Sequence, residues 1–236
     1  MTTLVDHTPT LDNDLLAEQT TVEFWIDPSC PFCWATARWL VDEVAPYRDL
    51  DVQWRPISLL LKNQPDPGSR YHEMAAHTHG MLRVMESVRS QYGNVGVSRL
   101  YWELGARIHH DRDRHFTATE ALESAGLDVG HAAAYDDESW DLVIREGMDD
   151  GLSLVGDDVG TPIIAVTNSR GERVAYFGPV ITKVPSTTDS LRMWDAVGNS
   201  TRAAQSDGVP SEQQRRAESP GPARRPAPLA RLRSSG

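Results

Sequence analysis

The chain has 236 residues, 39% of them hydrophobic, and a formal net charge of −11 at pH 7. This length fits one large domain or one domain with an insertion, and no run approaches the roughly 18 consecutive apolar residues of a membrane span. The acidic balance argues against nucleic-acid binding through the folded part, because phosphate groups would be repelled.

Residues 1–20 are expected to form a flexible N-terminal arm. They include Asp6, Asp12, Asp14 and Glu18 but no lysine or arginine. A secretory signal needs a basic segment followed by an apolar one, and this stretch has neither. We therefore expect the protein to stay in the cytoplasm, where paired cysteines are catalytic more often than structural.

The next segment, residues 21–57, predicts a βαβ unit. A strand-like apolar run occupies 21–26, a helical pattern follows at 31–45, and 51–55 alternates polar and apolar residues as a second strand does. Such a unit is expected to have a right-handed crossover. The turn from the first strand into the helix carries the sequence Cys30-Pro31-Phe32-Cys33-Trp34.

This turn holds the only two cysteines of the chain, in a spacing typical of a redox dithiol. Cys30 falls near the helix N-cap, where unpaired backbone N–H groups and the helix dipole favour thiolate over thiol. Pro31 suits the first helical position. One helical turn brings Cys33 within bonding reach but leaves it less exposed. We therefore predict Cys30 as the nucleophile, with a pKa of roughly 5.5–7.5, and Cys33 as the resolving thiol with a higher pKa.

Two acidic residues lie close to this turn in the sequence. Glu23, on the predicted strand, could be a buried carboxylate that deprotonates Cys33, or a plain acid at the sheet edge. Asp27, three residues before Cys30, would oppose the thiolate if it lies near.

Two other interpretations of the cysteines were weighed, namely separate structural cysteines and a zinc site. A zinc site needs three or four ligands, which the pairs His77/His79 and His109/His110 could supply. The chain has no second C-x-x-C pair, and Pro31 fits a redox turn better. We therefore expect a dithiol site without a metal.

Residues 58–159 contain no strand-like pattern and are predicted to form an all-helical insertion. Helical spacing of apolar residues predicts helices at 71–92, 98–109, 117–125, 130–135 and 138–149. Residues 63–69 are polar and contain prolines and a glycine, which indicates a loop.

Residues 160–198 return to the strand pattern. We predict a strand at 162–166, a turn at 168–171, a returning strand at 173–177, and a last helix that starts after Ser186 and runs through Val197. Residues 199–236 are rich in arginine and proline and have no periodicity, so this tail is expected to be disordered. Its seven arginines and three acidic residues give a net +4, which leaves −15 on residues 1–198. The tail is either native or an out-of-frame extension.

The order of these elements is that of a thioredoxin fold with an inserted all-helical domain. The chain resembles the cytoplasmic DsbA-like proteins, and most closely the mycothiol-dependent nitroreductase family of actinobacteria. The stretches that carry the resemblance are 24–34, 38–39, 58–59 with Asn63, 107–109, 147–149, 155–162 and 177–180.

The resemblance also implies residues around the dithiol. Pro162 matches a cis-proline that lies beside the two cysteines, and Thr161 would offer backbone hydrogen bonds to an incoming thiol or disulfide. Asn63 and Tyr71 match positions that face the dithiol, although an ordinary loop residue and a core tyrosine are the plainer interpretations.

Three residues of the turn itself, Pro31, Phe32 and Trp34, are the remaining candidates for contact with substrate or thiol. The family usually has Pro-Trp where this chain has Pro31-Phe32, so an aromatic face is kept while the indole N–H is lost. Trp34 fits a core position as well, and His109 matches the family but fits a structural role.

The function that the resemblance implies is that of a cytoplasmic thiol-disulfide oxidoreductase. Mycothiol would return the dithiol to its reduced state, and nitro-aromatic compounds or disulfides would be reduced without flavin. The partners would be this low-molecular-weight thiol and a small-molecule or disulfide substrate, with no nucleic acid and no membrane; the oligomeric state is not predicted.

Kappa-type glutathione transferases and 2-hydroxychromene-2-carboxylate isomerases share the architecture but do not need a second cysteine, so Cys33 argues against them. A non-catalytic, destabilised paralogue, or a binding module whose basic tail contacts an acidic partner, is the third alternative.

Overall fold

The computed structural model of the chain describes residues 20–167, 171 and 173–206. The predicted N-terminal arm up to residue 19, the predicted turn at 168–170, and the tail from residue 207 lie outside the described residues.

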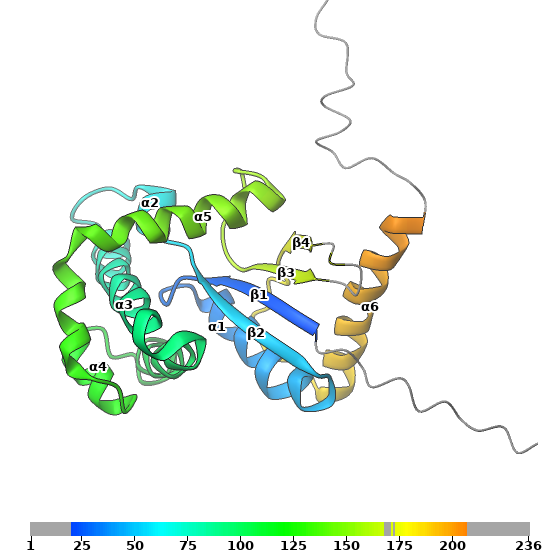
Figure 1. The fold of residues 1–236 in the computed structure, drawn as a ribbon, viewed down its shortest axis with the longest axis horizontal. Helices are drawn as coiled ribbons and strands as arrows, with labels where there is room; N and C mark the ends of the chain where they lie inside the picture. Colours follow the sequence, from blue (N-terminus) through cyan, green and yellow to red (C-terminus); the bar gives the residue numbers. More distant parts are fainter. Residues whose placement is uncertain (1–19, 168–170, 172, 207–236) are drawn as a thin grey trace, which may run out of the picture. The chain divides into compact units, whose positions relative to one another are not determined.

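A four-stranded mixed sheet forms the centre of the fold (Figure 1). Its strands stand in the order β2-β1-β3-β4, with β1 and β2 parallel and the other pairs antiparallel. Their bounds are Thr20–Ile26 for β1, Leu50–Pro56 for β2, Ile163–Thr167 for β3 and Arg173–Phe177 for β4. Phe24 of β1 stands opposite Trp54 on one side and Ile164 on the other, and all three are buried. The four strands agree with the predicted ones.

The predicted helix at 31–45 is split in the structure. It begins as α1 (Pro31–Arg38), widens into the π helix η1 (Trp39–Val44) and closes as the short 3₁₀ helix η2 (Ala45–Tyr47). Pro46, which has no backbone N–H to donate, lies inside η2, so helical structure ends at Tyr47, two residues past the predicted end at 45. The buried face of this segment includes Cys33, Ala37 and Leu40.

Helices occupy the whole interval between β2 and β3, on one side of the sheet in Figure 1. They are α2 (Leu59–Asn63), α3 (Arg70–Gly105), the π helix η3 (Ala106–Asp111), α4 (Ala118–Ser124), the 3₁₀ helices η4 (Val129–Asp136) and η5 (Glu138–Trp140), and α5 (Asp141–Val155). The two helices predicted at 71–92 and 98–109 meet at Gly93, whose φ of 60° and ψ of −157° interrupt the helical geometry inside α3.

The insertion packs on the sheet through large aromatic side chains. The Trp54 ring lies 4.9 Å from that of Tyr101 on α3. The indole N–H of Trp25 donates to the Gly147 carbonyl of α5 at 2.7 Å. A side chain at Gly151 would collide with the Trp25 ring, so α5 can approach β1 closely only with glycine there. These contacts fix the insertion beside the strand that leads to Cys30.

The last helix, α6, spans Thr187–Ser206 and continues past the predicted end near 198. Ser186 caps it, since the Asp189 N–H donates to the Ser186 hydroxyl at 3.4 Å and that hydroxyl donates to the Asp189 carboxylate at 2.9 Å. The Trp194 ring lies 6.1 Å from that of Trp39. Among the helices of the described ranges, none has the length and apolar character needed to cross a membrane.

Candidate active site

The turn between β1 and α1 is shaped by Asp27. The Asp27 carboxylate accepts hydrogen bonds from the backbone N–H and the hydroxyl of Ser29 at 2.8 and 2.7 Å. The Asp27 carbonyl accepts from the N–H of Cys30 at 3.0 Å. Cys30 thereby becomes the N-cap of α1, and Pro31 stands in its first turn. The sequence predicted this local geometry correctly.

The two cysteines are free thiols that contact each other across one helical turn. The N–H of Cys33 donates to the Cys30 sulfur at 3.4 Å. Only 4% of Cys30 is exposed and Cys33 is fully buried. The hidden sulfur of Cys33 lies 3.9 Å from the Trp25 carbonyl oxygen. The more accessible sulfur is therefore that of Cys30.

The two thiols have opposite electrostatic environments. The hydrogen bond from the Cys33 thiol lowers the pKa of Cys30 to about 7, with further donors in the Cys33 and Phe32 backbone N–H groups. Burial raises the pKa of Cys33 well above its usual value, and the charge of the Cys30 thiolate raises it further. Cys30 is thus the thiol that ionises first, and Cys33 is the one that keeps its proton. The largest cause of the lowered pKa of Cys30 is the neighbouring Cys33 thiol, whereas the sequence pointed to the helix terminus.

Thr161 and Pro162 lie beside the dithiol. The peptide bond between them is cis, as the resemblance implied. The Cys30 thiol lies 3.9 Å from the Thr161 carbonyl oxygen. The Pro162 carbonyl accepts from the N–H of Gly178 at 2.8 Å, which ties the start of β3 to the end of β4.

The aromatic candidates differ in their placement. Phe32 is 38% exposed on the first turn of α1. Trp34 is partly buried and stacks on His109, with the rings 6.0 Å apart and 21° from parallel. A side chain at Gly105 would collide with the Trp34 ring, so α3 has room for this indole only at a glycine. His109 in turn bonds through Nε2 to the Pro28 carbonyl oxygen at 2.8 Å, which anchors η3 to the turn that carries Cys30.

Asn63 and Tyr71 contact each other. The Asn63 amide donates to the Tyr71 hydroxyl at 2.7 Å, which joins the end of α2 to the first turn of α3. Both residues are exposed. The hydrogen bonds of the described residues do not extend from this pair to either cysteine, so their role toward the dithiol stays a prediction.

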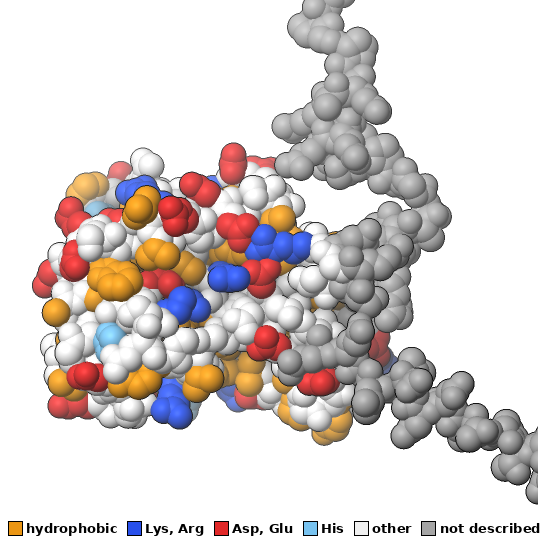
Figure 2. Space-filling model, viewed as in Figure 1, with side chains coloured by type: hydrophobic (Ala, Val, Ile, Leu, Met, Phe, Trp, Pro, Cys, Tyr) orange, Lys and Arg blue, Asp and Glu red, His pale blue; other side chains and the backbone are white. Residues whose placement is uncertain are grey.

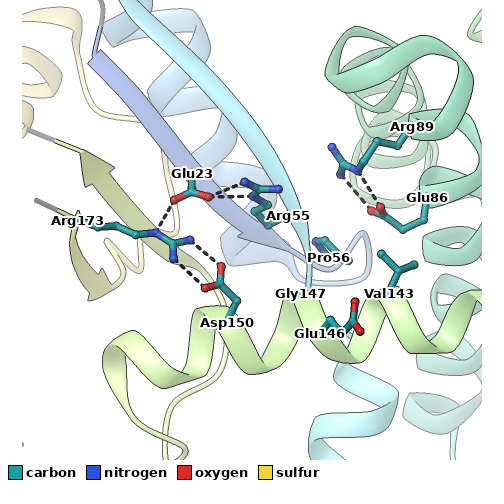
Figure 3. Close-up of a pocket in the computed structure, with 10 residues that line it drawn as sticks. All are labelled: Glu23, Arg55, Pro56, Glu86, Arg89, Val143, Glu146, Gly147, Asp150 and Arg173. Atoms are coloured by element: carbon teal, nitrogen blue, oxygen red, sulfur yellow. Dashed lines mark hydrogen bonds and ion pairs between the residues drawn. The ribbon is translucent and has the colours of Figure 1, made fainter. Parts of the chain in front are cut away.

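Of the two interpretations of Glu23, its use as the base that deprotonates Cys33 is contradicted by its contacts. Its carboxylate forms ion pairs with Arg55 at 2.7 Å and with Arg173 at 2.5 Å, and Arg173 also pairs with Asp150 at 2.6 Å (Figure 3). These groups line a pocket of about 370 Å³ to which neither cysteine contributes. In Figure 2 the charged side chains of opposite sign alternate where α5 passes the sheet. Two guanidinium groups hold Glu23 as a structural anion.

Asp27 is the buried acid of the site. It is fully buried, and burial raises the pKa of its carboxyl group, although hydrogen bonds from Leu59 and Ser29 lower it in part. The Leu59 N–H donates to it at 2.7 Å, so this carboxyl group fixes the start of α2 against the turn before Cys30. The sequence placed Asp27 near the thiolate but gave no signal of this long-range contact.

A second buried network continues from Ser58, which lies beside Leu59. The Ser58 hydroxyl lies 3.0 Å from Nδ1 of His79, and Nε2 of His79 lies 3.1 Å from the Asp141 carboxylate. Arg83 donates to the same carboxylate at 2.6 Å, and this bond is the main reason that the pKa of Asp141 is lowered. The network joins α3 and α5 to the start of α2 and so stabilises the insertion next to the site.

The histidines weighed as zinc ligands have other contacts. His79 bonds to Ser58 and Asp141, His77 to Tyr135, and His109 to Pro28. A search of the described part of the chain finds no group of three or more His, Cys, Asp or Glu side chains that could hold a metal ion. The arrangement that the structure does provide is an ionisable thiol with a protonated thiol behind it, which suits thiol–disulfide exchange.

The sequence and the fold were compared with known proteins. The model of the family described as Rv2466c-like, mycothiol-dependent nitroreductase Rv2466c, matches residues 29–207. The uncharacterized protein Rv2286c of Mycobacterium tuberculosis is 25% identical over 190 residues, which cover 75% of this chain and 76% of that protein.

Two solved structures have a similar fold. A candidate protein disulfide isomerase from Nitrosomonas europaea matches with a TM-score of 0.51 and 13% identity, over 76% of this chain and 97% of that one. The probable DsbA oxidoreductase SCO1869 from Streptomyces coelicolor matches with a TM-score of 0.50 and 14% identity, over 82% and 93% of the two chains. The predicted thioredoxin fold with a helical insertion is thereby confirmed.

Proposed function

The chain belongs to the Rv2466c-like family of mycothiol-dependent nitroreductases, and from this membership we propose that it reduces nitro-aromatic compounds or disulfides at Cys30 and Cys33. Mycothiol would supply the electrons, and the cytoplasm would be the place of reaction. The enzyme class, a thiol-dependent oxidoreductase, follows from the family; the substrate and the co-substrate are the proposed part.

The observation that carries this proposal is the difference between the two thiols. The pKa of Cys30 is lowered to about 7, mainly by the Cys33 thiol, while burial raises the pKa of Cys33 well above its usual value. An attacking thiol is most effective when its pKa is close to the ambient pH. Cys30 therefore meets the requirement for the first attack, and Cys33 stays protonated until that attack has occurred.

With a disulfide substrate, the Cys30 thiolate forms a bond to one sulfur, the substrate S–S bond breaks, and the other half leaves as a thiolate. Cys33 then loses its proton and attacks the Cys30 sulfur, which releases the second half and leaves a Cys30–Cys33 disulfide. With a nitro compound, the same two electrons and two protons give a nitroso compound and water. Two molecules of mycothiol then reduce the protein disulfide and leave as one oxidised mycothiol.

The other candidate residues would position the reactants. The backbone of Thr161, next to Pro162, would hydrogen-bond polar groups of the molecule that carries the incoming thiol or disulfide, since its carbonyl oxygen lies 3.9 Å from the Cys30 sulfur and so places this residue at the dithiol. Phe32 would offer an exposed aromatic face next to Pro31, while Trp34 would support the site from the side of α3. Asn63 and Tyr71, which are hydrogen-bonded to each other, would contact the reactants through their exposed polar groups.

The test is a trapping experiment with oxidised mycothiol, read by intact mass. Cys33→Ser should accumulate a Cys30–mycothiol disulfide, because the thiol that resolves it is gone. Cys30→Ser should form no adduct and should lose disulfide reduction. An adduct on Cys30→Ser alone would reverse the two roles, and no adduct on either variant would refute the proposal. Full activity of Cys33→Ser would instead favour a kappa-type transferase or isomerase, which needs one thiol.

A further inference from the structure

A second cavity, of about 530 Å³, lies between the start of α3 and the segment after η3. Its polar lining consists of two arginines, two histidines and one glutamate, namely Arg70, Arg114, His77, His115 and Glu73. With neutral histidines the lining is positive by one charge, whereas residues 1–198 together carry −15.

The two guanidinium groups of this cavity have no partner of their own. Within the described residues, neither Arg70 nor Arg114 forms a hydrogen bond or an ion pair, and both are exposed. Other arginines of the fold are engaged, such as Arg83 with Asp141 and Arg173 with Asp150. The donors of Arg70 and Arg114 are therefore available to a ligand, and a guanidinium group binds a carboxylate with two parallel hydrogen bonds.

His77 adds an unsatisfied donor to the same cavity. Its Nδ1 lies 2.9 Å from the Tyr135 hydroxyl, while its Nε2 is buried and has no hydrogen-bond partner in the described structure. Burial lowers the pKa of His77, which favours the neutral ring. When the Tyr135 hydroxyl donates to Nδ1, the ring proton lies on Nε2, which is shielded from solvent and has no acceptor among the described residues. The buried Phe116 ring, 4.8 Å from the His77 ring, gives the cavity an apolar wall.

The elements that bound this cavity also carry residues of the candidate active site. Arg70 is followed in the chain by Tyr71, whose hydroxyl accepts from Asn63. On the other side, burial lowers the pKa of His109, and the nearby charge of Arg114 lowers it further. His109 is bonded to the Pro28 carbonyl, two residues before Cys30. The segment that carries Arg114 is thus tied through His109 to the turn that carries Cys30.

We infer that this cavity binds a carboxylate, or another oxyanion of that size, on the molecule that Cys30 reduces, and so favours anionic over neutral electrophiles. The inference rests on the proposed function, because it assigns the substrate class of the same dithiol. No further reactant is needed, since the reduced dithiol supplies both electrons of one turnover.

Single-turnover kinetics with two aromatic disulfides test this inference. Dithiobis(nitrobenzoate) carries two carboxylates and dithiodipyridine carries none, and both release a coloured product when a thiolate attacks. Reduced wild-type protein would be compared with Arg70→Gln, Arg114→Gln and, as a control of equal charge, Arg145→Gln. Arg145 is exposed on α5, lies outside the cavity lining, and has no ion pair among the described residues.

Each cavity variant should slow the reaction with the dicarboxylate about tenfold, since one charge-assisted hydrogen bond pair is lost. The rate with dithiodipyridine should change less than about twofold, which also shows that the variant is folded, and Arg145→Gln should leave the ratio of the two rates unchanged. The inference is overturned if the ratio falls no further in Arg70→Gln and Arg114→Gln than in the control, or if both rates fall together. If wild-type protein reduces neither disulfide, the proposed function has failed, and the cavity loses its assigned role with it.

Discussion

Two acids lie four residues apart on β1 and the turn after it, and the structure treats them in opposite ways. Glu23 points into a cluster with Arg55 and Arg173, which surround its carboxylate with positive charge (Figure 3). Asp27 is fully buried and has only uncharged donors, so burial raises the pKa of its carboxyl group. Burial beside a countercharge favours the ionised carboxylate, whereas burial without one disfavours it and raises the pKa of the carboxyl group.

The same contrast separates the two regions as a whole. The cluster around Glu23 consists of carboxylates and guanidinium groups in direct ion pairs. The turn around Cys30 contains three groups with shifted pKa values, namely Cys30, Cys33 and Asp27, and no arginine or lysine forms a bond with them in the described residues. We therefore expect proton transfer at the turn around Cys30, and a role in stability for the ion pairs around Glu23.

The largest effect should come from removing Glu23. Glu23→Ala leaves Arg55 without its acid and Arg173 with only Asp150, so we expect the free energy of unfolding to fall by about 2–3 kcal/mol. Denaturant unfolding measures this change. Asp150→Ala is the matched control, because that carboxylate is 45% exposed and should contribute less than about 1 kcal/mol. The contrast between the two regions would not hold if Glu23→Ala also shifted the pKa of Cys30, since the ion pairs around Glu23 would then affect the dithiol.

The next effect concerns the reactivity of Cys30. Because its pKa is about 7, the thiolate fraction should rise about tenfold between pH 6 and pH 8, and the rate of alkylation by iodoacetamide should rise with it. Cys33→Ala should move this profile to higher pH, because the Cys33 thiol bond is the main cause of the lowered pKa. An unchanged profile in Cys33→Ala would mean that the helix terminus alone sets the reactivity.

The sequence predicted the dithiol turn well because its geometry is local. Cys30, Pro31 and Cys33 lie within one helical turn, so cap preferences and spacing determine their roles. The partners of Glu23 could not be predicted in this way, since Arg173 is 150 residues away in the chain. The cavity near Arg70 is likewise formed by segments far apart in sequence, and its histidine had suggested a metal ligand. Whether a buried acid or histidine has a hydrogen-bond or ion-pair partner depends on residues far away in the chain. The periodicity of the sequence does not show these long-range contacts.

The smallest effect is a difference in the pH dependence of stability between two neutralised acids. The pKa of Asp27 is raised in the folded state, so its contribution is present below its unfolded pKa of 3.8 and is lost as the pH rises through the folded value. The pKa of Asp150 is lowered, mainly by its bond to Arg173, so its contribution is present above 3.8 and is lost as the pH falls. Asp27→Asn should therefore gain stability relative to wild type as the pH rises above about 4, and Asp150→Asn should lose it as the pH rises from about 2 to 5. Urea unfolding at several pH values measures both slopes. Slopes of the same sign would show that Asp27 is ionised as readily as an ion-paired acid, and the contrast between the two regions would not hold.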